Sequence, residues 1–121
     1  MPERLIFGSR AAKFWFPDFR EPKDTDYISK DGKITKDVQN YWLPEFQEIL
    51  DINKHSEYID PELLLTVKLS HFCYNIHWSK TAGDIIFLKN KGLKVNKELY
   101  NKLLTGWIRE KGRQWVSLKG K

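Results

Sequence analysis

The chain has 121 residues, of which 40% are apolar and 31% charged, so it is long enough for one domain with one core and too apolar for a disordered protein. Its single cysteine, Cys73, excludes an internal disulfide and favours a reducing compartment. The sequence contains no apolar run approaching the ~20 residues of a membrane-spanning helix, so we expect a cytoplasmic protein with no membrane partner.

Charge is distributed unevenly along the chain. Residues 1–60 carry nine Lys or Arg and twelve Asp or Glu, a balance of −3, whereas residues 61–121 carry twelve and four, a balance of +8. An acidic half beside a basic half suits a site that holds a metal ion on one side and a polyanion on the other. The asymmetry therefore predicts a positive surface flanking an acidic pocket.

The first residues predict a strand that ends in a tight turn. Arg4–Phe7 is a short apolar run, and Gly8-Ser9 stops it. Residues 10–23 contain aromatic side chains and two prolines, which indicates a turn or short helix followed by an ordered loop.

Three further extended segments are expected before residue 60. Asp26–Ser29 and Ile34–Lys36 flank Asp31-Gly32, a dipeptide typical of the turn in a β-hairpin. The apolar positions of Phe46–Ile52 predict a third strand. The first half of the chain is thus expected to form a small mixed sheet.

The second half is predicted to be helical. Asp60-Pro61 is a strong helix start, with an N-cap acceptor followed by proline at the first helical position. Three helices are expected: from residue 61 to about 76, from Ser79 or Thr81 to Lys91 with Gly92 as its cap, and from Asn96 to Gly112, with a short strand at 114–118. Strands followed by helices indicate an α+β fold, with the sheet packed against about three helices in a single domain, 1–121.

The segment Asp24-Thr25-Asp26 carries the clearest chemical signal. Two carboxylates separated by one residue on a strand point to the same face, so Asp24 and Asp26 can hold one divalent cation. A carboxylate site suits Mg²⁺ or Mn²⁺, which in turn bind substrate phosphates. A turn at Gly8-Ser9 lets the backbone approach a phosphate closely, with the Ser9 hydroxyl as a donor.

Gly8-Ser9-Arg10-Ala11 followed by Asp24-Thr25-Asp26-Tyr27-Ile28 resembles the DNA polymerase β-like nucleotidyltransferase superfamily, in particular its minimal members and small proteins of tailed phages. The resemblance covers about residues 5–28. It implies that Gly8, Ser9 and Arg10 bind the phosphates of a nucleoside triphosphate. It also implies that Asp24 and Asp26 hold the catalytic metals and that a nucleic acid or protein accepts the nucleotidyl group, in the host cytoplasm if the gene belongs to a phage.

The superfamily uses a third carboxylate on a later strand, and Glu48 and Asp51 are the two alternatives here. Lys68 and Lys80 are predicted to lie nearest the pocket and to contact phosphate. Without a third carboxylate, the same fold would serve as a non-catalytic module that binds a nucleotide or nucleic acid, in a phage as an inhibitor of a host factor. A nucleotide phosphohydrolase is a further alternative, and the sequence leaves the nucleotide, the acceptor and the oligomeric state open.

Overall fold

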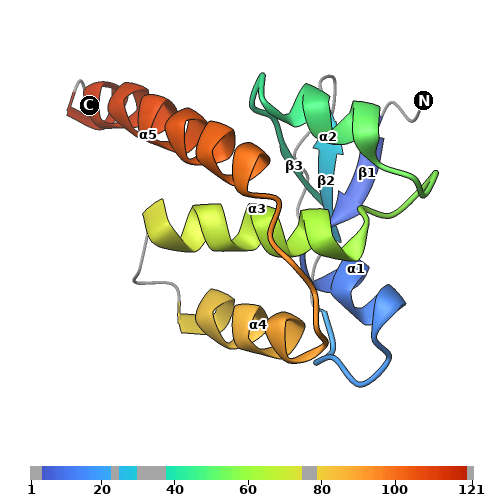
Figure 1. The fold of residues 1–121 in the computed structure, drawn as a ribbon. Helices are drawn as coiled ribbons and strands as arrows, with labels where there is room; N and C mark the ends of the chain where they lie inside the picture. The colour runs from blue at the N-terminus through green and yellow to red at the C-terminus, as the bar shows by residue number, and fades with distance from the viewer. Residues whose placement is uncertain (1–3, 23–24, 30–37, 75–78, 120–121) are drawn as a thin grey trace.

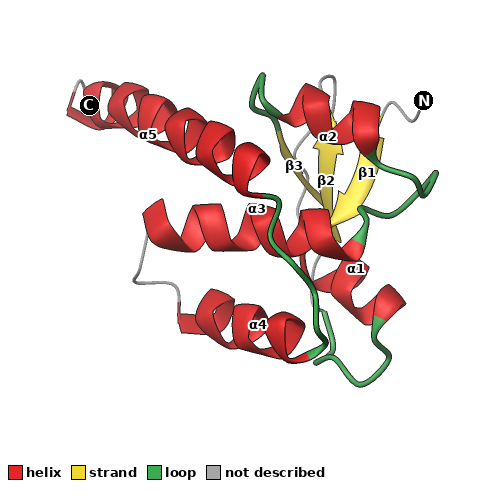
Figure 2. Ribbon diagram, viewed as in Figure 1, coloured by secondary structure: helices red, strands yellow, loops and turns green. Residues whose placement is uncertain are grey.

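Strands and two short helices form the first half of the chain, and three longer helices form the second (Figure 1). The computed structural model describes the backbone of residues 4–22, 25–29, 38–74 and 79–119. Its elements are β1 (Arg4–Phe7), α1 (Gly8–Trp15), β2 (Thr25–Ser29), β3 (Val38–Tyr41), α2 (Phe46–Ile52), α3 (Pro61–Tyr74), α4 (Ser79–Asn90) and α5 (Lys97–Lys119). Figure 2 shows the sheet on one side of the molecule and the helices around and beside it. The fold is α+β, as the order of the predicted elements indicated.

The sheet is mixed and has the order β1-β2-β3. β1 runs antiparallel to β2 with Phe7 opposite Asp26, and β2 runs parallel to β3 with Thr25 opposite Val38. The turn Asp31-Gly32 and the second strand Ile34–Lys36 of the predicted hairpin lie outside the described residues.

The segment that leads into α3 extends the sheet beyond β1. Ile6 N donates to the carbonyl of Glu57 at 2.9 Å, and Ile59 N donates to the carbonyl of Ile6 at 2.9 Å. A parallel bridge joins Ile6 and Tyr58. Residues 57–59 thus lie along the outer edge of β1.

The third predicted strand is wrong, because Phe46–Ile52 forms helix α2. Phe46, Ile49 and Leu50 are buried, whereas Ile52 is 44% exposed. Positions i, i+3 and i+4 lie on one face of a helix, while a strand would have placed Phe46, Leu50 and Ile52 on one face. The spacing of the apolar residues favoured a helix.

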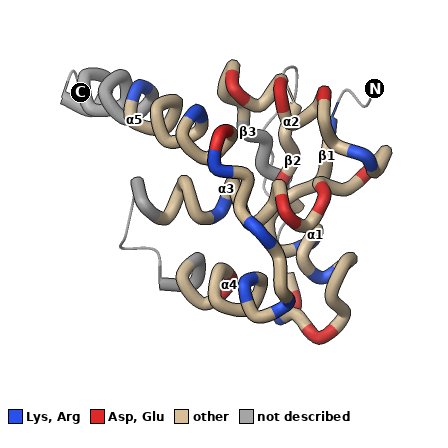
Figure 3. The backbone as a smooth tube through the Cα atoms, viewed as in Figure 1, with Lys and Arg blue, Asp and Glu red and all other residues tan. Residues whose placement is uncertain are grey.

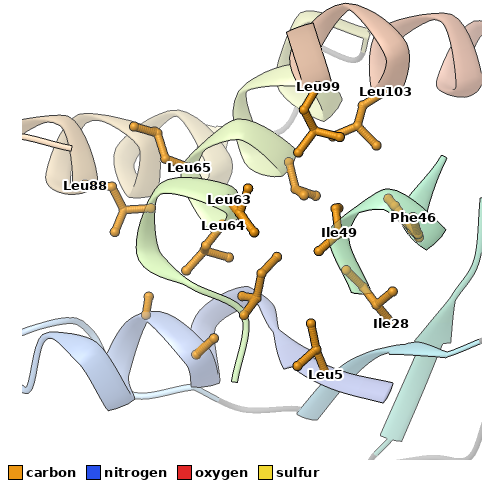
Figure 4. Close-up of a cluster of buried hydrophobic side chains, with 14 of the residues drawn as sticks. Leu5, Ile28, Phe46, Ile49, Leu63, Leu64, Leu65, Leu88, Leu99 and Leu103 are labelled. Carbon is orange, nitrogen blue, oxygen red and sulfur yellow. The ribbon is translucent and has the colours of Figure 1, made fainter. Parts of the chain in front are cut away.

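Helix α3 is the centre of the fold. It packs against α1, α4 and α5, and in Figure 1 it runs between α5 above and α4 below. Leu63, Leu64, Leu65 and Val67 are all buried, so α3 is apolar on every side over this stretch, as a helix enclosed by neighbours must be. Side chains from the sheet, α2, α3, α4 and α5 meet in one core (Figure 4), which includes Leu5, Ile28, Phe46, Ile49, Leu64, Leu88, Leu99 and Leu103.

The helix ends follow local sequence signals in most places. α3 begins at Pro61 as predicted, and Gly92 follows α4 with φ of +83°. Asn96 caps α5, since its Oδ1 accepts a hydrogen bond from Leu99 N at 3.1 Å. The predicted stop at Gly112 and the strand at 114–118 are wrong: α5 continues to Lys119, and a glycine costs a helix only about 1 kcal/mol. Within the part of the chain that the structure describes, none of the helices is both long and apolar enough to cross a membrane.

Candidate functional site

The side chain of Asp26 lies beside the first residue of α1. Gly8 is buried and has φ of +71°, and a Cβ atom placed on it would lie 2.5 Å from Asp26 Oδ2. A side chain at this position would strain the backbone and would require the Asp26 carboxylate to move, so glycine is favoured. Gly8-Ser9 is the start of a helix rather than a separate turn, and Asp26 on the neighbouring strand faces it.

The second aspartate of the predicted metal site is not described. β2 begins at Thr25, and Asp24 lies outside the described residues. The structure thus places one of the two predicted metal ligands, Asp26, next to the predicted phosphate-binding residues Gly8 and Ser9. No described group of three or more His, Cys, Asp and Glu side chains could hold a metal ion by itself.

A network of hydrogen bonds connects Ser9 to helices α3 and α4. Arg20 Nη2 donates to Ser9 Oγ at 2.7 Å and to Asp84 Oδ2 at 2.8 Å, and Arg20 Nε donates to Asp84 Oδ1 at 2.9 Å. Lys68 Nζ donates to Asp84 Oδ2 at 3.1 Å. One carboxylate, only 5% exposed, thus binds two cations, and the group carries a net charge of +1.

Arg20 and Asp84 are the members of this network that sequence reasoning missed. They are 64 residues apart, and no local motif connects them. One signal was present: Asp84 is the only acidic residue between Glu62 and Glu98, and two isoleucines follow it. A lone acid in an apolar, basic stretch is a candidate for a buried ion pair. The hydrogen bonds to Asp84 raise the pKa of the Arg20 guanidinium above its ordinary value, so it stays charged.

Arg10, which the resemblance assigned to phosphate binding, follows Ser9 in the first turn of α1. Its Nε is buried and has no hydrogen-bond partner among the described residues. Buried charged donors without an acceptor are rare in proteins, because desolvation is expensive. An anion bound near this turn would supply the missing acceptor.

The two alternatives for a third carboxylate are on helix α2, not on a strand, and each has another partner. Glu48 Oε1 accepts a hydrogen bond from Lys102 Nζ on α5 at 3.0 Å. Asp51 Oδ1 accepts one from Gln47 Nε2 at 3.0 Å. The structure does not bring either carboxylate together with Asp26.

Part of the basic charge of the second half is paired with acids of the first half, and Figure 3 shows where Lys, Arg, Asp and Glu lie along the backbone. Ion pairs join Lys91 to Asp18 at 2.8 Å, Lys102 to Glu48 at 3.0 Å and Arg109 to Glu45 at 2.7 Å. The charge asymmetry along the sequence is thus in part a consequence of packing one half against the other. The side chain of Lys80 lies outside the described residues.

His71, one turn from Lys68 on α3, is held in its neutral form. Burial, together with the nearby charge of Lys68, lowers the pKa of His71 from 6.5 to about 4. Its ring lies 4.6 Å from that of Trp107, and Asp84 is bonded to the two cations instead. Asp84 is thus bonded to Arg20 and Lys68, and His71 packs against Trp107.

A cleft of about 800 Å³ lies at the other end of α1, away from Gly8 and Ser9. It is lined by Trp15, Ile52, Lys54, His55, Asp60, Pro61, Glu62, Leu63, Lys94, Val95 and Asn96. None of the predicted site residues contributes to it. This cleft and the predicted site residues thus lie in different parts of the molecule.

A family model described as "Domain of unknown function (DUF7277)" matches residues 4–104. The chain belongs to this family. The match includes Gly8, Ser9, Asp26, Arg20 and Asp84, and it extends into α5. No curated protein and no solved structure matches the chain.

Proposed function

We propose that this DUF7277 domain binds a nucleoside triphosphate with Mg²⁺ or Mn²⁺ at the first turn of α1. We further propose that it is a nucleotidyltransferase-like protein that transfers the nucleotidyl group to a nucleic-acid or protein acceptor. The observation that carries the proposal is the position of the Asp26 carboxylate against Gly8. A carboxylate beside a glycine-led helix start can hold a metal ion while the helix N-terminus binds the phosphate.

The cations around Ser9 support binding of phosphate. Arg20 uses Nε and Nη2 for Asp84 and Ser9, and its Nη1 has no acceptor among the described residues. The Arg20 side chain is 42% exposed, so Nη1 can donate to a bound oxygen while Asp84 holds the guanidinium in place. Lys68 is 12% exposed, and its ammonium group is bound to the same carboxylate, so it adds positive charge to the site.

The residues also fit the proposed metal ion. Mg²⁺ is commonly held by one or two carboxylates, with water and substrate phosphates completing its coordination. Asp26, together with Asp24 from just before β2, would provide those carboxylates. When bound, the ion would neutralise phosphate charge and help to activate the attacking hydroxyl.

A second candidate, nucleotide binding without turnover, rests on the engagement of Glu48 and Asp51. Both carboxylates are on α2 and are bonded to Lys102 and Gln47, so neither supplies the third ligand that the superfamily uses. The same site would then bind a nucleotide and release it unchanged.

Binding and turnover are measured with the four ribonucleoside triphosphates and Mn²⁺, by calorimetry and with α-labelled nucleotide. Asp26→Asn should weaken binding at least about tenfold, because it removes a charged metal ligand. Glu48→Gln is the matched control and should change binding by less than roughly twofold. Equal affinities for the two variants would contradict the proposal. Binding by the wild type without labelled product would select the second candidate.

A further inference from the structure

The cleft at the far end of α1 has the size and lining of a small-molecule site. Its volume of about 800 Å³ falls within the ~300–1,000 Å³ typical of ligand pockets. Trp15 ends α1, Ile52 ends α2, and Leu63 lies in the first turn of α3, so three helices meet around it. Val95, from the loop between α4 and α5, adds a fourth wall.

Apolar side chains dominate these walls and continue onto the surface beside them. Ile52 is 44% exposed, and Phe14, which stacks on Tyr58 with ring centres 3.9 Å apart, is 46% exposed. Trp15 Nε1 donates to the carbonyl of Ile59 at 2.7 Å, which fixes its indole ring. This part of the apolar wall is therefore preformed, so binding a ligand costs little conformational entropy there.

The two carboxylates of the cleft are already engaged by the backbone. Asp60 accepts hydrogen bonds from Lys54 N at 2.7 Å and His55 N at 3.2 Å. Glu62 accepts one from Lys94 N at 2.7 Å. By contrast, the ammonium groups of Lys54 and Lys94 have no partner among the described residues. The cleft thus offers ammonium donors without a described partner, beside two carboxylates that backbone N–H groups already bind.

His55 adds a donor of fixed geometry. Its Nδ1 accepts hydrogen bonds from Glu57 N at 3.1 Å and Tyr58 N at 3.0 Å, so the ring proton is on Nε2. The ring is further fixed by contacts with Trp15 and Phe14, with centres 5.3 Å away in each case. No described residue accepts a hydrogen bond from Nε2.

We propose that this cleft is a second ligand site, which binds a small organic anion with an aromatic or aliphatic body. The body would lie against Trp15, Ile52 and Val95, and the anionic group would bind the ammonium groups of Lys54 and Lys94. Apolar walls favour the body, and charge-assisted hydrogen bonds select an anion over a neutral analogue. The site is separate from the proposed nucleotide site, because the eight residues of α1 lie between them.

The probe for the apolar wall is 1-anilinonaphthalene-8-sulfonate, which combines an aromatic body with one anionic group. Ile52→Glu should weaken its binding at least about tenfold, because a carboxylate then replaces part of the apolar wall. Ile86→Glu is the matched control: Ile86 is also on a helix and is 62% exposed, but it does not line the cleft. Both isoleucines are exposed, so both variants should fold, as thermal unfolding monitors. Equal weakening in the two variants, or none in Ile52→Glu, would overturn the site.

The anion preference is tested with N-phenyl-1-naphthylamine, the neutral counterpart of the probe. Lys94→Ala keeps the backbone bond to Glu62 and should weaken sulfonate binding roughly fivefold while leaving the neutral dye unchanged. Lys89→Ala, an exposed lysine of α4 outside the cleft, should change neither dye. Equal effects of Lys94→Ala on both dyes would overturn the preference for anions. Asp26→Asn should leave sulfonate binding intact, which separates this proposal from the nucleotide site.

Discussion

The charged side chains near the two ends of helix α1 differ in how they are paired. At the first turn, the buried Asp84 carboxylate binds both Arg20 and Lys68, and Arg20 reaches Ser9. At the last turn, the carboxylates of the cleft accept backbone N–H groups, and nearby lysine ammonium groups have no described partner. In the first region both cations are bound to a buried carboxylate, whereas in the second the lysine ammonium groups have no ion-pair partner among the described residues.

The difference follows from burial. A buried carboxylate is tolerated only when cations and hydrogen bonds compensate its lost hydration, so Asp84 must be paired. Lys54 and Lys94 are exposed, and water already compensates their charge. The first region is thus held in one geometry by its own ion pairs, whereas the two lysines of the second have no ion-pair partner among the described residues.

Removal of Asp84 should disrupt its ion pairs with Arg20 and Lys68 and have the largest effect on stability. Asp84→Ala leaves Lys68, which is 12% exposed, without its counter-charge, and we expect a loss of about 3 kcal/mol in the free energy of unfolding. Asp18→Ala removes the exposed acid of the Lys91 pair and should change stability little. Urea unfolding of the two variants measures this contrast, and similar losses in both would show that the buried network does not stabilise the fold.

Gly8→Ala should have an intermediate effect on stability, because the added Cβ atom strains the backbone and meets the Asp26 carboxylate. Gly8 and Gly92 both have positive φ, but only Gly8 faces a nearby atom, Asp26 Oδ2. Gly92→Ala should cost about 1 kcal/mol from backbone strain, and Gly8→Ala about 2 kcal/mol. Adding Asp26→Ser to Gly8→Ala should bring its cost down to that of Gly92→Ala. If the second substitution has no such effect, the carboxylate is not what excludes a side chain at Gly8.

The smallest expected effect is a dependence of stability on pH, caused by His71. Because the pKa of His71 is lowered from 6.5 to about 4, the unfolded chain binds more protons than the folded one between these values. Stability should therefore fall as the pH falls through this window, by roughly 1 kcal/mol between pH 7 and pH 5 after allowance for partial exposure. Unfolding measured across this range should show a flatter slope for His71→Gln. An identical slope would mean that another group is responsible.

Local signals in the sequence predicted the starts of α3 and α5 and the end of α4, because the cause of each lies within a few residues, but they misplaced the end of α5. Asn96 caps α5 through its own side chain, and Gly92 follows α4 with a positive φ. Asp60-Pro61 marks the start of α3, although its carboxylate binds Lys54 N and His55 N instead of the helix. A local pattern fixes where a helix begins but not which group its N-cap side chain will bind.

Long-range partners could not be predicted in this way. Arg20 and Asp84 come together only because the loop after α1 packs against α4, and nothing near Arg20 in the sequence signals that contact. The parallel pairing of β3 likewise depends on where the chain returns to the sheet. The α2 error was different in kind: the burial of Phe46, Ile49 and Leu50 follows a helical period that the sequence already contained.

The pairing of residues 57–59 with β1 has a consequence for aggregation. An open strand edge presents unpaired N–H and C=O groups to which another chain can add. Here Ile6 N and the Ile6 carbonyl are both bonded to the segment that leads into α3. This edge can become available for intermolecular pairing only if the start of the central helix comes away from the sheet. Substitutions that loosen residues 57–59 should therefore favour self-association before they abolish the fold.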